Sequence, residues 1–78
     1  MKIVYTKHAE EMLAFRKIKK EFVDKTVKNP DDKSTGKGGK AIVYKNFGKN
    51  YLKVVIFKEG DKVFVITEHW IAKRRIKK

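Results

Sequence analysis

Asn29-Pro30 and the ten residues after it, 31–40, divide this 78-residue chain into two unlike parts. A residue that precedes proline is disfavoured in the α-helical region, so a helix that reaches this point must end at Asn29. Residues 31–40 contain three glycines and no apolar side chain, so they cannot join a hydrophobic core, and they predict a mobile loop. Regular structure must therefore form separately on either side of this segment.

The part before the break has the spacing of helices. Residues 2–5 are β-branched and aromatic and predict a short strand, after which Thr6 offers a hydroxyl that can cap a helix. Apolar residues three and four positions apart then predict helices over 7–18 and 20–28. Arg16 lies at the border of the first apolar stripe.

The part after the break has the spacing of strands. Its apolar and aromatic residues fall into three short segments, and a glycine-containing turn separates each from the next. The expected strands are 41–47, 51–57 and 63–67. The order is then β-α-α-β-β-β, which predicts an α+β fold of two layers, with an antiparallel sheet covered on one face by two helices.

Alternation sorts the last two expected strands into two faces, because successive side chains of a strand point to opposite sides. One face is mostly aliphatic and suits the layer under the helices: Leu52, Val54, Ile56, Val63, Val65, Thr67 and His69. The other face places aromatic groups beside charges: Tyr51, Lys53, Val55, Phe57, Phe64, Ile66, Glu68 and Trp70. We expect this second set to form a ligand surface. An equal alternative is that Phe57, Phe64 and Ile66 pack beneath the long loop or against a second copy.

Composition excludes several classes of protein. The chain has no cysteine, which rules out disulfides, thiolate-bound zinc and thiol catalysis. His8 and His69 are the only histidines and lack the spacing of a metal motif, so we expect no cofactor. No apolar run approaches the ~18 residues of a membrane span, and the first residues lack the apolar stretch of a signal peptide, so we expect a cytoplasmic protein.

An excess of positive charge is the clearest indication of a partner. Lysine and arginine number 21 against 9 acidic residues, which gives a formal net charge of +12. A small domain with such self-repulsion usually meets a polyanion, and phosphate backbones are the commonest one. An anionic membrane ranks lower, because no expected helix joins a broad apolar face to a basic one. The charge-rich composition also leans toward a thermophilic source.

Cleavage of RNA is compatible with the side chains of this sequence, because the reaction requires neither a metal nor a thiol. The candidate proton-transfer groups are His8, Glu68 and His69. The candidate phosphate ligands are Arg16, Lys53, Arg74 and Arg75, and the candidate base-stacking residues are Tyr51 and Trp70. Ordinary structural roles are open to the same residues: a solvated histidine, a Lys53–Glu68 ion pair across two strands, a tryptophan in the core.

Several segments of the chain together resemble a family of small proteins with a His-Ala-x-x-x-Met/Leu-x-x-Arg helix. The resemblance rests on Tyr5 to Leu13 with Arg16, on Phe22-Val23, on Asn29-Pro30-Asp31 and on the segment 63–68. That family is similar to the RelE/ParE-like and BrnT-like toxins, whose fold has the order β-α-α-β-β-β. The resemblance implies a toxin-type ribonuclease that acts with or without the ribosome, and an acidic antitoxin as its partner. Only His8 and Arg16 match polar positions of the family pattern.

We therefore expect one RelE-like domain over residues 1–78, with a basic tail over about 70–78. The leading expectation is a toxin-type protein that binds RNA, including ribosome-bound mRNA, and cleaves it without a metal. The alternative is a non-catalytic nucleic-acid-binding module of a thermophile. The sequence leaves the oligomeric state and the strand order of the sheet open.

Overall fold

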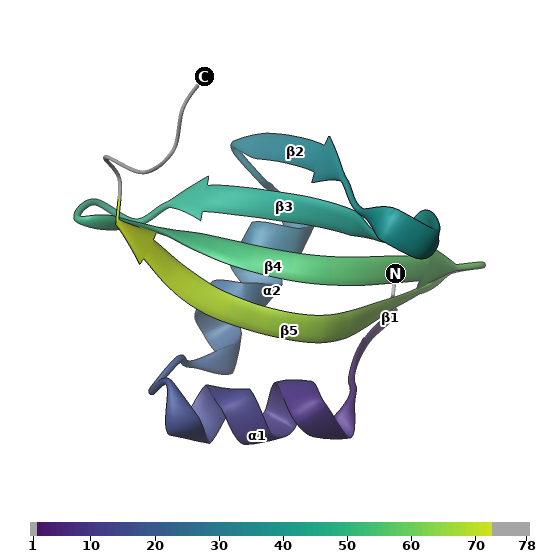
Figure 1. Ribbon diagram of the computed structural model, residues 1–78, viewed down its shortest axis with the longest axis horizontal. Helices are drawn as coiled ribbons and strands as arrows, with labels where there is room; N and C mark the ends of the chain where they lie inside the picture. The colour runs from purple at the N-terminus through teal and green to yellow at the C-terminus, as the bar shows by residue number, and fades with distance from the viewer. Residues whose placement is uncertain (1, 73–78) are drawn as a thin grey trace.

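A computed structural model describes residues 2–72 of the chain (Figure 1). Within these residues it has two α-helices, five strands and one short 3-10 turn. In chain order they are β1 (Lys2–Tyr5), α1 (Lys7–Phe15), α2 (Lys20–Lys28), β2 (Asp32–Thr35), η1 (Lys37–Gly39), β3 (Ala41–Asn46), β4 (Asn50–Glu59) and β5 (Lys62–Ala72).

The five described strands form one sheet in the order β1-β5-β4-β3-β2. β1 runs parallel to β5, whereas the other neighbouring pairs are antiparallel. The expected α+β class is confirmed, with both helices packed on the sheet, but the sheet is mixed rather than antiparallel. The departure arises where the first and last strands meet, because neither segment's own sequence specifies the direction of so distant a partner.

β2 occupies part of the segment for which a loop was expected. It has four residues that pair with β3, and the Asp31 amide adds a bond to the Tyr44 carbonyl at 2.8 Å. A strand at the edge of a sheet can be held by backbone hydrogen bonds while its side chains stay in water. The pattern of apolar residues therefore could not reveal it.

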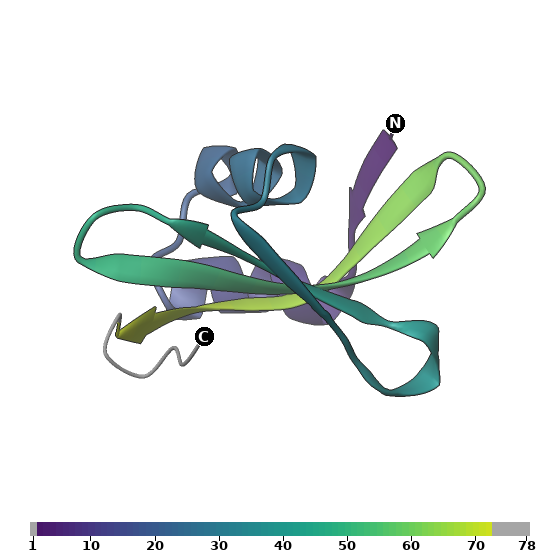
Figure 2. The ribbon, with the colours of Figure 1, turned by 90° about the horizontal axis from the view of Figure 1, so that it is seen from above.

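The connection from β2 to β3 folds back onto the sheet. Gly38 and Gly39 have φ values of 66° and 78°, in the left-handed region that glycine adopts without strain. A Cβ atom on Gly39 would lie 3.5 Å from the ring of Phe57, so the η1 turn rests on this ring. Figure 2 shows this connection on the opposite side of the sheet from α2. Packing beneath the loop, one of the expected roles of Phe57, is thus confirmed for this residue.

Both helices and one side of the sheet share a single core. α1 packs against β5 and β1, and α2 packs against β3 and β4 (Figure 1). The buried apolar residues are Ala9, Leu13, Ile18, Val23, Val27, Val43, Leu52, Val54, Ile56, Val63 and Val65. We call the side of the sheet that bears Leu52 and Val54 the helix-side face, and the opposite side the open face.

α1 ends at Phe15, before the expected end at residue 18. Lys17 has a φ of 55°, which turns the chain out of the helix, and the Ile18 amide donates to the Leu13 carbonyl at 2.9 Å. Ile18 is buried in the core. Its apolar side chain therefore belongs to the connection between the helices, although its spacing resembles that of a helix.

A β-bulge at Ile66 changes which residues of β5 face the helices. Val65 pairs with Ile56 and Thr67 with Val55, so Ile66 has no partner of its own in the register. An extra residue of this kind reverses the alternation beyond it. Glu68 consequently lies on the helix-side face, where it is the cross-strand partner of Val54. The face assignment expected for residues 67–70 was wrong, because alternation read from a sequence contains no sign of a bulge.

Candidate nucleic-acid interface

The open face carries a compact group of aromatic and basic side chains near one end of the sheet. Tyr44 of β3, Lys53 of β4 and His69 of β5 lie in one row across three strands. The next row contains Asn46, Tyr51 and Ile71. We call Tyr44, Tyr51, Lys53 and His69 the tyrosine end of the open face. All four side chains are partly exposed, so a ligand can reach them.

The other end of the open face has an aromatic row followed by a charged one, in which Lys62 pairs with Glu59 and with Lys2. Phe57 pairs with Phe64, which also pairs with Val4 of β1. The η1 turn lies against Phe57 here. Aromatic groups and lysines thus occur at both ends of the open face, but among the described residues an imidazole accompanies them only at the tyrosine end.

His69 has the chemistry of a base at neutral pH. Its pKa lies below the ordinary 6.5, first because burial disfavours the charged imidazole, and further because Lys53 and Arg16 are positive. Lys53 is its direct cross-strand neighbour. A neutral imidazole beside an ammonium group can accept a proton while the ammonium group attracts a phosphate.

Glu68 lies on the opposite face from its neighbour His69 and is fully buried, with 0% of its surface exposed. Among the described residues 2–72, neither carboxyl oxygen has a hydrogen-bond partner. Burial raises the pKa of Glu68 from 4.5 to about 7, Glu10 adds to this effect, and the positive charge of Arg16 opposes it. Glu68 and Lys53 therefore form no cross-strand pair, and RNA on the open face would not meet this carboxyl.

Other charged groups surround the buried end of Glu68. Tyr5 on β1 donates a hydrogen bond to Asp24 of α2 at 2.8 Å, and burial together with this bond raises the pKa of Tyr5. Lys20 lies 5.0 Å from the Tyr5 ring centre and pairs with Glu10 at 3.1 Å. This polar network joins both helices to β1 and leaves the Glu68 carboxyl unpaired.

Arg16 supports the backbone of β5 where β1 ends. β1 pairs only with residues 62–65 of β5, so the following carbonyls on that edge lack a strand partner. The Arg16 Nη1 atom donates to the Glu68 carbonyl at 2.9 Å, and the Thr6 hydroxyl donates to the Ile66 carbonyl at 3.3 Å. Arg16 is thus engaged with the backbone carbonyl of the residue that precedes His69, and its positive charge contributes to the lowered pKa of His69.

Trp70 and His8 lie apart from the tyrosine end. Trp70 packs edge-on against Phe22 and Phe47, with ring centres 6.0 and 5.9 Å away, which is the core role considered for it. His8 is exposed at the start of α1, in the layer that covers the other face of the sheet. The structure does not bring either residue to His69.

The basic tail is only partly described. β5 continues to Ala72, so residues 70–72 belong to the strand, and Ala72 pairs with Asn50 at the tyrosine end. Arg74 and Arg75 lie outside the described residues. Sequence reasoning missed Tyr44. Its neighbour Val43 is apolar and suits the core, and because successive side chains of a strand point to opposite faces, this alternation could have placed Tyr44 on the open face.

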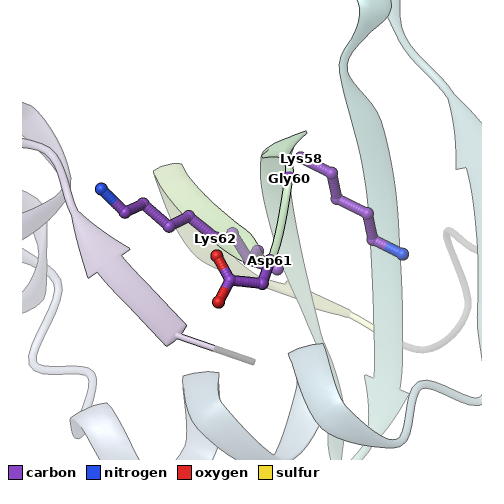
Figure 3. Close-up of a pocket in the computed structure, with 5 residues that line it drawn as sticks. Lys58, Gly60, Asp61 and Lys62 are labelled. Atoms are coloured by element: carbon purple, nitrogen blue, oxygen red, sulfur yellow. The ribbon is translucent and has the colours of Figure 1, made fainter.

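A shallow hollow of about 280 Å³ lies at the turn between β4 and β5, lined by Lys58, Gly60, Asp61, Lys62 and Val63 (Figure 3). In Figure 3 the Lys58 and Lys62 side chains extend to opposite sides, with the Asp61 carboxylate between them. A phosphate site needs donors that converge on one point. This hollow is therefore a poor match for a nucleic-acid phosphate.

Metal and membrane sites do not emerge from the part of the chain that the structure describes. Across residues 2–72, no group of three or more histidine or acidic side chains could hold a metal ion. In the same range no helix is long and apolar enough to cross a bilayer.

A comparison of the chain with protein-family models, with curated proteins and with solved structures gives no match. The argument for a function consequently depends on the residues of the open face and on their chemistry.

Proposed function

We propose that this protein binds single-stranded RNA on the tyrosine end of its open face, as a RelE-like protein of the toxin type. The observation that carries the proposal is the row of Tyr44, Lys53 and His69 on the sheet face that neither helix covers. Aromatic rings stack on bases, and an ammonium group neutralises a phosphate. The net charge of +12 supports the same class of partner, because it attracts a polyanion from a distance.

The toxin-type part of the proposal rests on the resemblance of the segment around His8-Ala9 and Arg16. It includes ribosome-bound mRNA as a substrate and an acidic antitoxin protein as a partner, which would neutralise the basic surface. The non-catalytic alternative uses the same interface and differs only in the absence of cleavage.

Cleavage is the second candidate function, and the position of His69 favours it. In this reaction the 2′-oxygen attacks the adjacent phosphorus, its proton passes to the neutral His69 imidazole, and the bond from phosphorus to the 5′-oxygen breaks. The leaving oxygen takes a proton from water, and the products are a 2′,3′-cyclic phosphate and a 5′-hydroxyl. Lys53 would stabilise the added negative charge on the phosphorane.

Binding is tested with a fluorescein-labelled single-stranded RNA in EDTA, by anisotropy. Lys53→Ala and Tyr51→Ala should weaken binding several-fold. Lys25→Ala removes the same charge from an exposed position on α2 and should leave the affinity nearly unchanged. Equal losses for Lys53→Ala and Lys25→Ala would contradict a defined site on the open face.

Cleavage is tested on the same RNA by gel electrophoresis in EDTA, with and without ribosomes. We expect His69→Ala to abolish cleavage, and His8→Ala to retain it, because His8 lies in the other layer. Binding without any cleavage by the unaltered protein would leave the non-catalytic alternative. Undiminished cleavage by His69→Ala would exclude His69 as the base.

A further inference from the structure

Tyr44 and Tyr51 are diagonal neighbours on two adjacent strands. Tyr44 pairs with Lys53, and Tyr51 lies two residues before Lys53 on β4. Diagonal pairs on one face of an antiparallel sheet lie about 7 to 8 Å apart. The two rings therefore form two separate platforms, with Lys53 next to both of them.

This separation is unlike the spacing of bases in a helix. Stacked bases rise by about 3.4 Å per step along a strand, roughly half the distance between the two rings. Two consecutive bases that each stack on one tyrosine consequently cannot stack on each other. A duplex holds its bases stacked and paired, so it cannot occupy both platforms.

The charges around the rings indicate where the phosphate lies. Lys53 is adjacent to both tyrosines on the same face. A phosphate is attracted to its ammonium group. The phosphate between the two bases is therefore placed at Lys53.

From this arrangement we infer that the tyrosine end is a two-base site, which takes two consecutive unstacked nucleotides of single-stranded RNA on Tyr44 and Tyr51 and their bridging phosphate on Lys53. The inference rests on the proposed function and deepens it. Because His69 faces Lys53 across the strands, the bridging phosphate is also the one nearest the candidate base.

The test compares single-strand and duplex binding by tyrosine variants. The probe is a fluorescein-labelled octamer of 2′-O-methyl uridine, which cannot be cleaved through its 2′-oxygen, and the same octamer paired to its complement. Tyr44→Ala and Tyr51→Ala should each weaken single-strand binding by about 5-fold or more, the range of one lost base stack. Duplex binding should be weaker from the start and unchanged by either substitution.

Two controls separate stacking from folding. Tyr44→Phe and Tyr51→Phe keep the ring and should retain single-strand affinity within about 2-fold, since stacking depends on the ring face. Phe15→Ala removes the one large apolar side chain that is highly exposed among the described residues, at 77%, and it lies on α1. It should leave binding unchanged. Thermal unfolding of each variant identifies any loss that comes from misfolding.

The failures of the two proposals have different signatures. If the unaltered protein does not bind the single strand, the proposed function fails. If it binds but only one tyrosine matters, or if neither does while Lys53→Ala still weakens binding, RNA binding stands and the two-base site is wrong. Equal affinity for strand and duplex would also overturn the two-base site.

Discussion

Glu68 and His69 are neighbours on β5, yet they lie in two regions with opposite properties. On the helix-side face, Glu68 is buried, its carboxyl has no hydrogen-bond partner in the described part of the chain, and its pKa rises to about 7. On the open face, His69 stays partly exposed beside Lys53, and its pKa falls. Burial acts on both groups in the same way, because in each it disfavours the charged form.

The bulge at Ile66 determines which of the two residues faces the helices and which faces solvent. Without the extra residue, alternation would place Glu68 on the open face beside Lys53 and would turn His69 toward the helices. Glu68, with a pKa of about 7, is about half protonated at neutral pH but is buried, whereas His69 is partly exposed and can meet a ligand. The helix-side face therefore governs stability, and the open face is available for binding.

The largest expected effect is a difference in stability between a substitution on the buried helix-side face and one on the partly exposed open face. Leu52→Ala on the helix-side face should lower the free energy of unfolding by about 2 to 5 kcal/mol, because Leu52 is fully buried. Val55→Ala on the open face should cost about 1 kcal/mol or less, since this side chain is partly exposed. Urea unfolding at fixed pH and salt measures both. Equal losses would indicate that something covers the open face in solution.

The second effect concerns the unpaired carboxyl of Glu68. Its pKa in the folded protein is about 7, above the ordinary 4.5, so the folded state holds this proton more tightly than the unfolded state. Stability from this group should be fully present below pH 4.5 and should be lost as the pH rises through 7, by about 3 kcal/mol in total. Urea unfolding of the unaltered protein and of Glu68→Gln across this pH range measures the difference. Parallel curves for the two proteins would contradict it.

A smaller effect is expected where the chain leaves β1 and enters α1. The Thr6 hydroxyl accepts a bond from the Ala9 amide at 3.1 Å and also donates to β5. Thr6→Ala should therefore reduce the free energy of unfolding by about 1 kcal/mol, and Thr6→Ser should restore most of it. Ser34→Ala on the exposed edge strand is the matched control and should have almost no effect. An equal loss of unfolding free energy in Ser34→Ala would contradict a specific contribution of the Thr6 cap.

The smallest expected effect is a change in how RNA affinity depends on salt when Lys53 on the open face is replaced. Lys53→Ala should make the dependence of RNA affinity on salt less steep by about 0.7 in a double logarithmic plot, the contribution of one phosphate contact to a single strand. The exposed Lys25→Ala should leave this slope unchanged. RNA titrations of each variant between low and moderate salt measure the slope. An unchanged slope for Lys53→Ala would contradict a contact between Lys53 and a phosphate.

Local patterns were enough to predict much of the fold. The helix over 20–28, the start of α1 at Lys7 and the presence of three C-terminal strands follow from side-chain spacing, caps and turn glycines. What was missed depends on contacts between distant segments. β2 is held by backbone pairing to β3, and the direction of β1 is set by β5, so neither leaves a trace in its own side chains.

The candidate site was predicted less well, for one physical reason. Lys53 and Tyr51 lie on the open face, where alternation placed them, but the bulge exchanged the faces of residues 67–70, which brought His69 to the open face and turned Trp70 toward the core. A bulge depends on the fit between two strands rather than on either sequence alone. Tyr44 entered the group only when the register of β3 and β4 placed it beside Lys53.

The bond from Arg16 to the Glu68 carbonyl has a consequence for how copies of this chain meet at high concentration. An unpaired sheet edge invites a strand of another molecule, and native proteins often protect such edges with charge. Here β1 pairs with β5 only as far as residue 65, and beyond it the Thr6 hydroxyl donates to the Ile66 carbonyl and the Arg16 guanidinium group donates to the Glu68 carbonyl. A strand added to this edge would have to displace a cation from its acceptor. The same arginine that completes the backbone bonding of β5 thereby works against edge-to-edge aggregation.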